Sequence, residues 1–296
     1  MRIAFINDYD CSEYLGGAAL VNDYIIHFLQ EAGHSVTYIG INPNRNDWSL
    51  LERDAFDILF LANLPFLSVQ QIEHLTNCGT PYIVFRHDIL PCCYVENPES
   101  RNEYTLIKNL LKNSHKNFYI SETQKQYYHR IHQRADDRVI PPPINLTQFF
   151  NQNIPTRAGI IYLGPISEIR GINEILAYQK DANISQQITF CGKLESSELL
   201  NKIIDSGNIY IEEVPRSRVP ELFNQYEALI HIPNFFDSFC VKVIEAELCG
   251  MRIITIPQRI GRYCYAMDAT SLAAFMQKDS LAALQGEIMS IPPCVP

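Results

Sequence analysis

Short runs of β-branched and aromatic residues alternate along the chain with longer stretches of helical periodicity. Runs of this length, bounded by turn residues, are typical of buried strands. The clearest helical pattern covers residues 17–33, because apolar side chains recur on one face and Gly33 follows as a stop signal. In the first half of the chain the runs predict strands at 2–6, 35–40, 56–62, 81–86, 117–121 and 138–143.

The stretch 141–159 interrupts this rhythm with three consecutive prolines, several amides and Gly159, and it predicts a domain boundary. Strands alternating with helices favour parallel sheets that carry helices on both faces. We therefore expect an α/β protein with two Rossmann-like domains, residues 1–150 and 151–296, that face each other across a cleft. In such folds ligands bind at the carboxyl ends of the strands. The second domain is predicted to contain strands at 159–164, 187–192, 209–213, 228–233 and 252–257, and a last helix at about 271–288.

Composition narrows the classes of function. The formal net charge of −9 argues against a general nucleic-acid binder, which usually has a basic surface. Nine cysteines, odd in number and without a C-x-x-C pair, argue against a disulfide scaffold or structural zinc and favour a cytoplasmic location. No apolar run approaches the ~18 residues of a membrane span. The opening run is too short for a signal peptide and is interpreted as a first strand.

Two places in the first half are candidates for binding. Gly16 and Gly17 fall between the first strand and the first long helix, where backbone N–H groups at a helix start favour a phosphate. The alternative is an ordinary tight turn. His87 follows the fourth predicted strand, where it could donate a hydrogen bond to a substrate oxygen or serve only the strand end.

The second half carries an acid-rich apolar segment, DSFCVKVIEAELCG at 237–250. Asp237 and Ser238 look like the cap of a helix that covers 239–249 and is apolar nearly all round. Glu245, two turns inside, is either half of a buried salt bridge or a carboxylate that binds hydroxyl groups. Asp237 either caps the helix or contacts a sugar. Glu247 is expected to be structural.

A further candidate is Arg170, which precedes Gly171 shortly after the strand that ends at Gly164. A guanidinium near a helix start can hold a phosphate, and the alternative is a solvated surface arginine.

These motifs resemble the retaining, GT-B-fold glycosyltransferases of family 4, also called glycosyl transferases group 1. Residues 237–250 resemble the E-x7-E element of that family, with Glu245 as the second acid, and depart from it at Asp237 and Cys240. Residues 160–176 are similar to its G-R-x-x-x-x-K-G region, with Pro165 and Arg170 in place of the Arg and the Lys. Residues 212–233 resemble the segment of the family that precedes the E-x7-E element. The resemblance covers most of the chain and extends, more loosely, to 14–40, 86–88 and 139–149.

The resemblance implies transfer of a sugar from a nucleotide diphosphate sugar, with retained configuration, no metal and no cofactor. It implies that Glu245 binds ribose, that Arg170 and the glycines Gly16, Gly17 and Gly164 lie at the diphosphate, and that Asp237 and His87 hold the donor sugar. The backbone N–H groups at the helix start are expected to contribute as well, from Ser238, Phe239, Cys240 and Val241.

Two other functions stay open. One is a degenerate, non-catalytic GT-B module that binds a sugar nucleotide or a partner protein. The other is a dinucleotide oxidoreductase, which the missing G-x-G-x-x-G disfavours. For the enzyme, the expected partners are a nucleotide-sugar donor and a carbohydrate or lipid-linked acceptor. Nucleic acid is not expected, and the acidic balance leaves at most weak membrane association.

Overall fold

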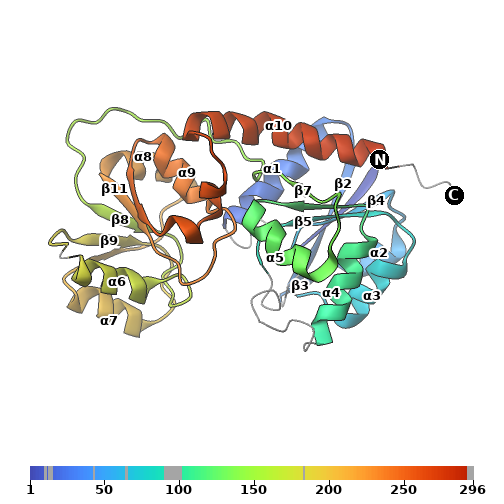
Figure 1. Cartoon of the computed structure of the whole chain (residues 1–296), viewed down its shortest axis with the longest axis horizontal. Helices are drawn as coiled ribbons and strands as arrows, with labels where there is room; N and C mark the ends of the chain where they lie inside the picture. The colour runs from blue at the N-terminus through green and yellow to red at the C-terminus, as the bar shows by residue number, and fades with distance from the viewer. Residues whose placement is uncertain are drawn as a thin grey trace. The chain divides into compact units, whose positions relative to one another are not determined.

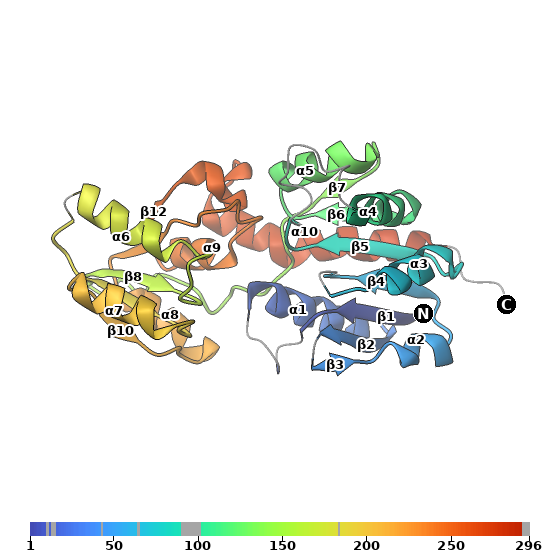
Figure 2. The same cartoon turned by 90° about the horizontal axis from the view of Figure 1, so that it is seen from below.

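The computed structural model describes residues 1–9, 12, 16–42, 44–63, 66–89, 102–182 and 184–291. The chain divides into two compact units, which we describe one at a time. Unit 1 comprises Met1–Asn145 and the segment that begins at Ala274, and unit 2 comprises Leu146–Ala273. Each unit is a parallel sheet with helices on both faces, as Figures 1 and 2 show.

Unit 1 contains a seven-stranded sheet in the order β3-β2-β1-β4-β5-β6-β7. Every pair is parallel except β2 with β3. Helices α1 and α10 cover one face, and α3 and α4 cover the other (Figure 1). The strands are β1 (Arg2–Asn7), β2 (Ser35–Asn42), β3 (Arg45–Asn46), β4 (Ile58–Leu61), β5 (Tyr82–Arg86), β6 (Lys116–Tyr119) and β7 (Arg138–Val139). The helices are α1 (Gly17–Glu31), α2 (Ser49–Arg53), α3 (Val69–Asn77), α4 (Asn102–Asn113), α5 (Glu122–His132) and most of α10 (Ala269–Ser290).

The expected second domain, 151–296, is wrong at its C-terminal end. From Ala274 onward the chain belongs to unit 1. The reason is that Leu284 and Ile288 of α10 are buried, and Glu287 forms ion pairs with Lys116 at 3.8 Å and Arg138 at 2.9 Å.

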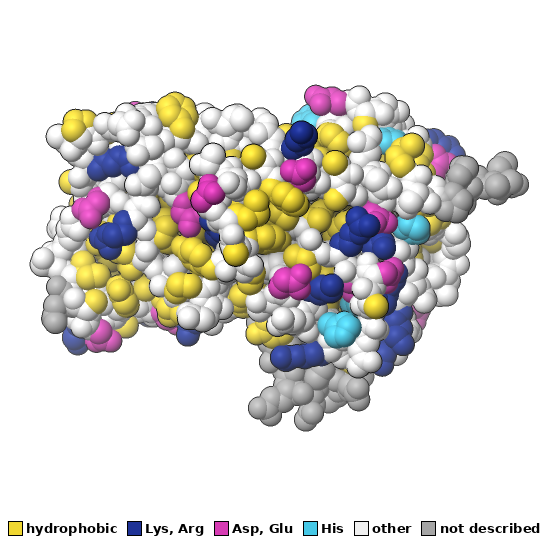
Figure 3. All heavy atoms as spheres, turned by 45° about the horizontal axis from the view of Figure 1, so that its top comes forward, with side chains coloured by type: hydrophobic (Ala, Val, Ile, Leu, Met, Phe, Trp, Pro, Cys, Tyr) yellow, Lys and Arg dark blue, Asp and Glu magenta, His cyan; other side chains and the backbone are white. Residues whose placement is uncertain are grey.

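A shallow groove between α1 and α10 is lined by Tyr24, Phe28, Ala274, Gln277, Lys278, Leu281, Ala282 and Gln285. Figure 3 shows apolar side chains gathered on this side of the molecule.

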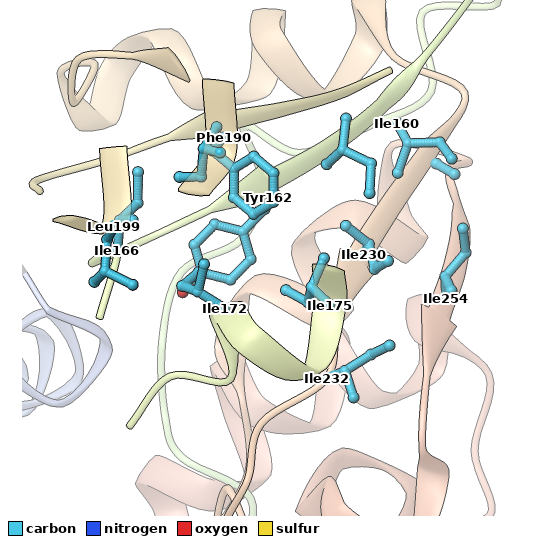
Figure 4. Close-up of a cluster of buried hydrophobic side chains, with 13 residues drawn as sticks. Ile160, Tyr162, Ile166, Ile172, Ile175, Phe190, Leu199, Ile230, Ile232 and Ile254 are labelled. Atoms are coloured by element: carbon cyan, nitrogen blue, oxygen red, sulfur yellow. The ribbon is translucent and has the colours of Figure 1, made fainter. Parts of the chain in front are cut away.

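Unit 2 contains a five-stranded, fully parallel sheet in the order β10-β9-β8-β11-β12. Its apolar core lies between the sheet and α6, where Ile172 and Ile175 pack against Tyr162 and Ile230 (Figure 4). The strands are β8 (Ile160–Leu163), β9 (Ile188–Cys191), β10 (Ile209–Ile211), β11 (Ala228–His231) and β12 (Arg252–Thr255). The helices are α6 (Ile172–Asp181), α7 (Ser197–Asp205), α8 (Val219–Gln225) and α9 (Val241–Leu248), with short 3-10 turns at Arg216–Arg218, Pro257–Arg259 and Gly261–Cys264.

All eleven strands predicted above form, so the α/β prediction is confirmed. The strand predicted at 138–143 is reduced to Arg138–Val139, because the prolines that follow cannot donate ladder hydrogen bonds. The two-residue strand β3 was not predicted, since it has no apolar pattern. Among the described helices, none is both long enough and apolar enough to cross a membrane.

Candidate active site

The strand order of unit 2 reverses direction between β8 and β11, which is where doubly wound sheets bind ligands. The loops that follow these two strands touch each other. A Cβ atom on Gly171 would lie 1.9 Å from the carbonyl oxygen of Ile232, so only glycine fits between them. Asn234 donates to the carbonyl oxygen of Glu168 at 3.2 Å. Arg170, in the first loop, lies over the ring of Phe235, in the second, at 5.5 Å.

Gly164 directly follows β8 at the same edge of the sheet, one residue short of the predicted strand end. Its φ of 127° is in the region that favours glycine. The neighbouring Gly192 ends β9, and a Cβ atom there would lie 1.9 Å from the Gly164 carbonyl oxygen. The two strand ends therefore pack backbone against backbone. This leaves the edge of the sheet without side chains at both positions.

The expected helix cap at Asp237 and Ser238 is wrong. Helix α9 begins at Val241, and its N-cap is Cys240, which has a φ of 65° and makes no side-chain capping bond. Asp237 instead forms an isolated parallel bridge with Ile260, in which its carbonyl oxygen accepts from the N–H of Gly261 at 2.8 Å. This pairing holds the segment extended, so it cannot be the first turn of a helix.

The carboxylate of Asp237 accepts a hydrogen bond from His231 Nε2 at 3.2 Å and keeps 18% of its side chain exposed. Burial alone raises the pKa of Asp237, but the hydrogen bond and charge of His231, with Lys242 and Arg170 nearby, lower it to about 2. Burial lowers the pKa of His231 to about 4. At neutral pH the pair is therefore a carboxylate facing a neutral imidazole.

Lys242 is a site residue that the sequence reasoning missed. Its Nζ donates to the carbonyl oxygen of Leu163 at 2.8 Å and lies 4.8 Å from the ring centre of Tyr162. A Cβ atom on Gly164 would be 3.3 Å from the same Nζ, so the ammonium group lies at the end of β8. The available signal was a lysine in the first turn of the helix that carries Glu245.

Glu245 is buried and paired. Both of its carboxylate oxygens accept from the guanidinium of Arg216, one of them at 2.8 Å, and Arg216 also lies over the ring of Phe149 at 4.6 Å. The salt-bridge alternative is therefore present in the structure, and ribose binding by the remaining lone pairs of Glu245 stays a prediction. Glu247 forms a similar pair with Arg262 at 2.9 Å, as expected for a structural acid.

The other residues at the start of α9 differ in exposure. Ser238 and Phe239 are buried, and Phe239 packs edge-on against Tyr265 with 5.8 Å between ring centres. The Ser238 hydroxyl has no hydrogen-bond partner among the described residues. Val241 is the first residue of the helix and is partly exposed. The structure thus brings Gly164, Arg170 and the segment 237–241 to one edge of unit 2.

In unit 1, Gly16 is the N-cap of α1 and Gly17 is its first residue, as the sequence indicates. His87 follows β5, and its Nε2 contacts Asn22 Oδ1 of α1 at 2.6 Å. Because that oxygen only accepts, Nε2 carries the proton and Nδ1 is left as an acceptor. His87 in this tautomer can accept a hydrogen bond from a hydroxyl group, whereas we expected it to donate one. Burial, with the charge of Arg86, lowers the pKa of His87 to about 3, so the ring is neutral.

Asp8 is a second residue that the sequence reasoning missed. It follows β1 at the point where the order of unit 1 reverses, and it accepts from Asn63 Nδ2 at 3.0 Å and from the N–H of Tyr9 at 2.9 Å. Burial raises the pKa of Asp8 against the lowering effect of these bonds and of Arg86. An acid directly after a strand was the available signal.

The sequence matches no protein-family profile and is not significantly similar to any curated protein. The structure is similar to that of sucrose-phosphate synthase from Thermosynechococcus elongatus, at 15% identity over 97% of this chain and 98% of the other, with a TM-score of 0.72. It is also similar to Anabaena HepE in complex with UDP-glucose, at 13% identity over 97% and 100% of the two chains, with a TM-score of 0.70. The third is AviGT4, a glycosyltransferase involved in avilamycin A biosynthesis, at 13% identity over 98% and 97%, with a TM-score of 0.62. The two Rossmann-like units of this chain therefore form the GT-B fold of glycosyltransferases.

Proposed function

We propose that this chain is a glycosyltransferase that moves a sugar from a nucleotide diphosphate sugar to an acceptor hydroxyl. The observation that carries the proposal is the pair of cations, Arg170 and Lys242, at the switch point of unit 2. They come from different segments, yet both lie close enough to Asp237 to lower its pKa. The similarity to HepE, whose structure holds UDP-glucose, supports the same choice of donor.

The proposed diphosphate site combines positive charge with close access to the protein backbone. Arg170 and Lys242 balance the phosphate charges, and the first turn of α9 adds backbone N–H groups and the positive end of its dipole. Gly164 carries no Cβ atom beside the Lys242 ammonium group, so phosphate oxygens can approach the backbone there. In unit 1, the start of α1 at Gly16 and Gly17 offers a second set of N–H groups for an anion.

The side chains that we assign to the sugar and ribose hydroxyls act as hydrogen-bond acceptors. Asp237 keeps part of its carboxylate exposed and accepts hydrogen bonds from sugar hydroxyls. His87, neutral and with Nδ1 as an acceptor, accepts a hydrogen bond from a sugar hydroxyl in the same way. Glu245, held in place by Arg216, accepts from ribose hydroxyls through the lone pairs that the guanidinium leaves open.

In the reaction, the bond between the anomeric carbon and the diphosphate oxygen breaks, and the acceptor oxygen forms the new bond to that carbon. The proton of the acceptor hydroxyl passes to the leaving diphosphate. The leaving diphosphate gains negative charge, which Arg170, Lys242 and the helix dipole stabilise in place of a divalent ion. We therefore propose a metal-independent transfer, and the resemblance to family 4 supports a retained configuration. A cytoplasmic location is proposed with it, since the described cysteines are all free thiols.

A ligand screen tests the proposal. Thermal unfolding is measured with UDP-, GDP-, ADP- and CMP-sugars, and only a binder raises the melting temperature, since a hundredfold excess over Kd stabilises by about 2.7 kcal/mol. The stabilising donor is then incubated with the protein, and release of free nucleotide diphosphate is followed. Stabilisation without turnover or hydrolysis, tested across carbohydrate and lipid-linked acceptors, would instead establish the non-catalytic binding module.

Chelation tests the proposal that the transfer needs no metal ion. EDTA should leave the rate of donor turnover unchanged, because the proposed charge stabilisation comes from two side chains and a helix. Loss of turnover on chelation, restored by Mn²⁺ or Mg²⁺, would contradict it.

A further inference from the structure

Three side chains between the end of β11 and the start of α9 form a compact set of metal-ligand types. The ligand atoms of His231, Asp237 and Cys240 all lie within 4.8 Å of one another. His231 is fully buried and Cys240 is 8% exposed, while Asp237 keeps a path to solvent through its 18% exposed side chain. We propose that these three residues form a site for Zn²⁺ or a transition-metal ion of similar softness, and that occupation of the site inhibits the protein.

The geometry fits tetrahedral zinc. Ligands at about 2.0–2.2 Å from a tetrahedral zinc lie about 3.3–3.5 Å from each other. The 3.2 Å between His231 Nε2 and Asp237 Oδ2 is already one such edge. The Cys240 sulfur lies within 4.8 Å of both other ligand atoms, so it has to move closer to them to reach the Zn–S distance of about 2.3 Å. Three protein ligands leave the fourth position open to water.

One hydrogen bond already joins two of the three side chains, because His231 Nε2 donates to the Asp237 carboxylate at 3.2 Å. His231 Nδ1 is buried and has no hydrogen-bond partner among the described residues. Imidazole and thiolate are the ligands that zinc prefers over magnesium or calcium, so the donor set also indicates which metal binds.

Charge explains how a cation can bind beside Lys242 and Arg170. When Zn²⁺ binds, the His231 ring stays neutral and shifts its proton from Nε2 to Nδ1, which frees Nε2 for the metal, and the Cys240 thiol releases its proton to solvent. The thiolate and the Asp237 carboxylate then bring two negative charges to the ion. The resulting complex is neutral, so its repulsion by the two cations is small. An ion with only oxygen ligands would bring no thiolate and would stay positive.

The inhibition rests on the proposed function, because Asp237 is the residue that we assign to the donor sugar. A carboxylate bound to zinc cannot accept hydrogen bonds from that sugar in the same geometry. Zinc would therefore act by removing a sugar contact, not by supplying a catalytic ion, and the expected metal-free turnover is unaffected.

Spectroscopy with Co²⁺ tests the site without any reference to activity. The full-length, tag-free chain is titrated with Co²⁺, and a thiolate-to-cobalt charge-transfer band in the near ultraviolet is expected to saturate at one equivalent. The band should disappear in Cys240→Ser and stay in the control Cys249→Ser, which alters another buried cysteine of unit 2. Zn²⁺ should displace the cobalt. A band of equal strength in Cys240→Ser, or no band in the wild-type protein, would overturn the proposal.

Cys240→Gly serves as the second variant, because its φ of 65° suits glycine and the variant is expected to fold. Calorimetric titration should show Zn²⁺ binding at least about tenfold weaker in this variant. Zinc should lower donor turnover in the wild-type protein and, relative to its own zinc-free rate, much less in Cys240→Gly. If no donor is turned over, the proposed function fails while the cobalt band still decides the metal site.

Discussion

At the scale of single residues, Lys242 shows how a charge is kept in an apolar helix. Burial lowers the pKa of Lys242, and the nearby Cys240 and Asp237 act in the opposite direction. Its ammonium group is fixed by one carbonyl oxygen at 2.8 Å and one aromatic face at 4.8 Å. A lysine held in this way has already given up its side-chain freedom, so binding an anion costs little further entropy.

The two cations should be specific for phosphate charge. Arg170→Ala and Lys242→Ala are each expected to weaken binding of the intact nucleotide diphosphate by about tenfold or more, because a charge-assisted hydrogen bond contributes about 1.5–3 kcal/mol. Binding of the bare nucleoside should be unchanged in both variants, since neither cation interacts with the base or ribose. Lys180→Ala, an exposed lysine in the last turn of α6, removes the same charge and is the control. Calorimetry with both ligands measures this, and equal losses for nucleotide and nucleoside would show that these cations serve the fold.

The role of Glu245 is tested by combining a substitution in the protein with a change in the ligand. If it accepts from the ribose hydroxyls, Glu245→Gln should weaken donor binding by about tenfold to a hundredfold. The same loss should appear when wild-type protein binds a 2′,3′-dideoxy nucleotide, and the two losses should not add, because both remove one interaction. Calorimetric titration of the four combinations measures the coupling.

The ion pair with Arg216 makes stability alone uninformative here, because Glu245→Gln removes that pair under either interpretation. Glu247→Gln is the matched control, since it removes the neighbouring pair with Arg262 and has no ribose role in the proposal. Fully additive losses in the Glu245 cycle, equal to those of the Glu247 control, would assign Glu245 to the salt bridge only.

At the scale of elements, the loop from β8 to α6 is held against the loop after β11 by the close contact at Gly171. Two glycines with similar backbone angles separate conformational strain from steric clash. Gly171 has a φ of 84°, and a Cβ atom there would lie 1.9 Å from a backbone oxygen, whereas Gly207 has a φ of 74° and nothing within 4 Å of the same position. Gly207→Ala should cost about 1–2 kcal/mol of unfolding free energy from strain alone. Gly171→Ala should cost about 1–3 kcal/mol more, because a backbone has to move.

Denaturant unfolding followed by circular dichroism measures the free energy of unfolding of both variants, since Gly171 and Gly207 both lie in unit 2. Gly171→Ala should also weaken donor binding, since Arg170 is the adjacent residue, and Gly207→Ala should not. Equal effects of the two substitutions on stability and on binding would show that the contact between the loops is not important.

The alternation of apolar runs was enough to predict the strands, because each buried strand needs such a run whatever its neighbours are. The start of α9 could not be predicted in this way. Asp237 and Ser238 have the composition of a cap, and only the bridge to Ile260 reveals an extended segment. The ion-pair partners of the charged residues could not be predicted from the sequence either. Arg216 and Glu245, for example, lie 29 positions apart and come into contact only in the folded chain.

At the scale of the whole molecule, buried histidines make stability depend on pH. Burial lowers the pKa of His87 to about 3 and of His132 to about 4, against an ordinary value of 6.5, so both are neutral in folded unit 1. As the pH falls below 6.5, the unfolded chain takes up a proton at each histidine while the folded chain does not. The free energy of unfolding should therefore decrease as the pH decreases, by about 1.4 kcal/mol per pH unit for each histidine.

Trp48 is the single tryptophan of the chain and lies in unit 1, so its fluorescence reports the unfolding of that unit. Urea unfolding between pH 6.5 and 5 measures the slope above the range where most carboxylates titrate. His132→Gln should remove the contribution of one histidine, up to about 1.4 kcal/mol per pH unit. A slope that is unchanged in this variant would show that His132 is not held neutral.

The return of α10 to unit 1 has a consequence for the order in which the protein is made. Unit 2 is one continuous stretch, Leu146–Ala273, whereas unit 1 is completed only by residues that follow it. During synthesis from the N-terminus, unit 2 can therefore close its sheet while unit 1 still lacks the helix that carries Leu284 and Ile288. Until Leu284 and Ile288 emerge from the ribosome, the α1 side of the first sheet exposes apolar surface. Nascent chains stalled before these residues emerge should therefore be the ones that chaperones bind most strongly.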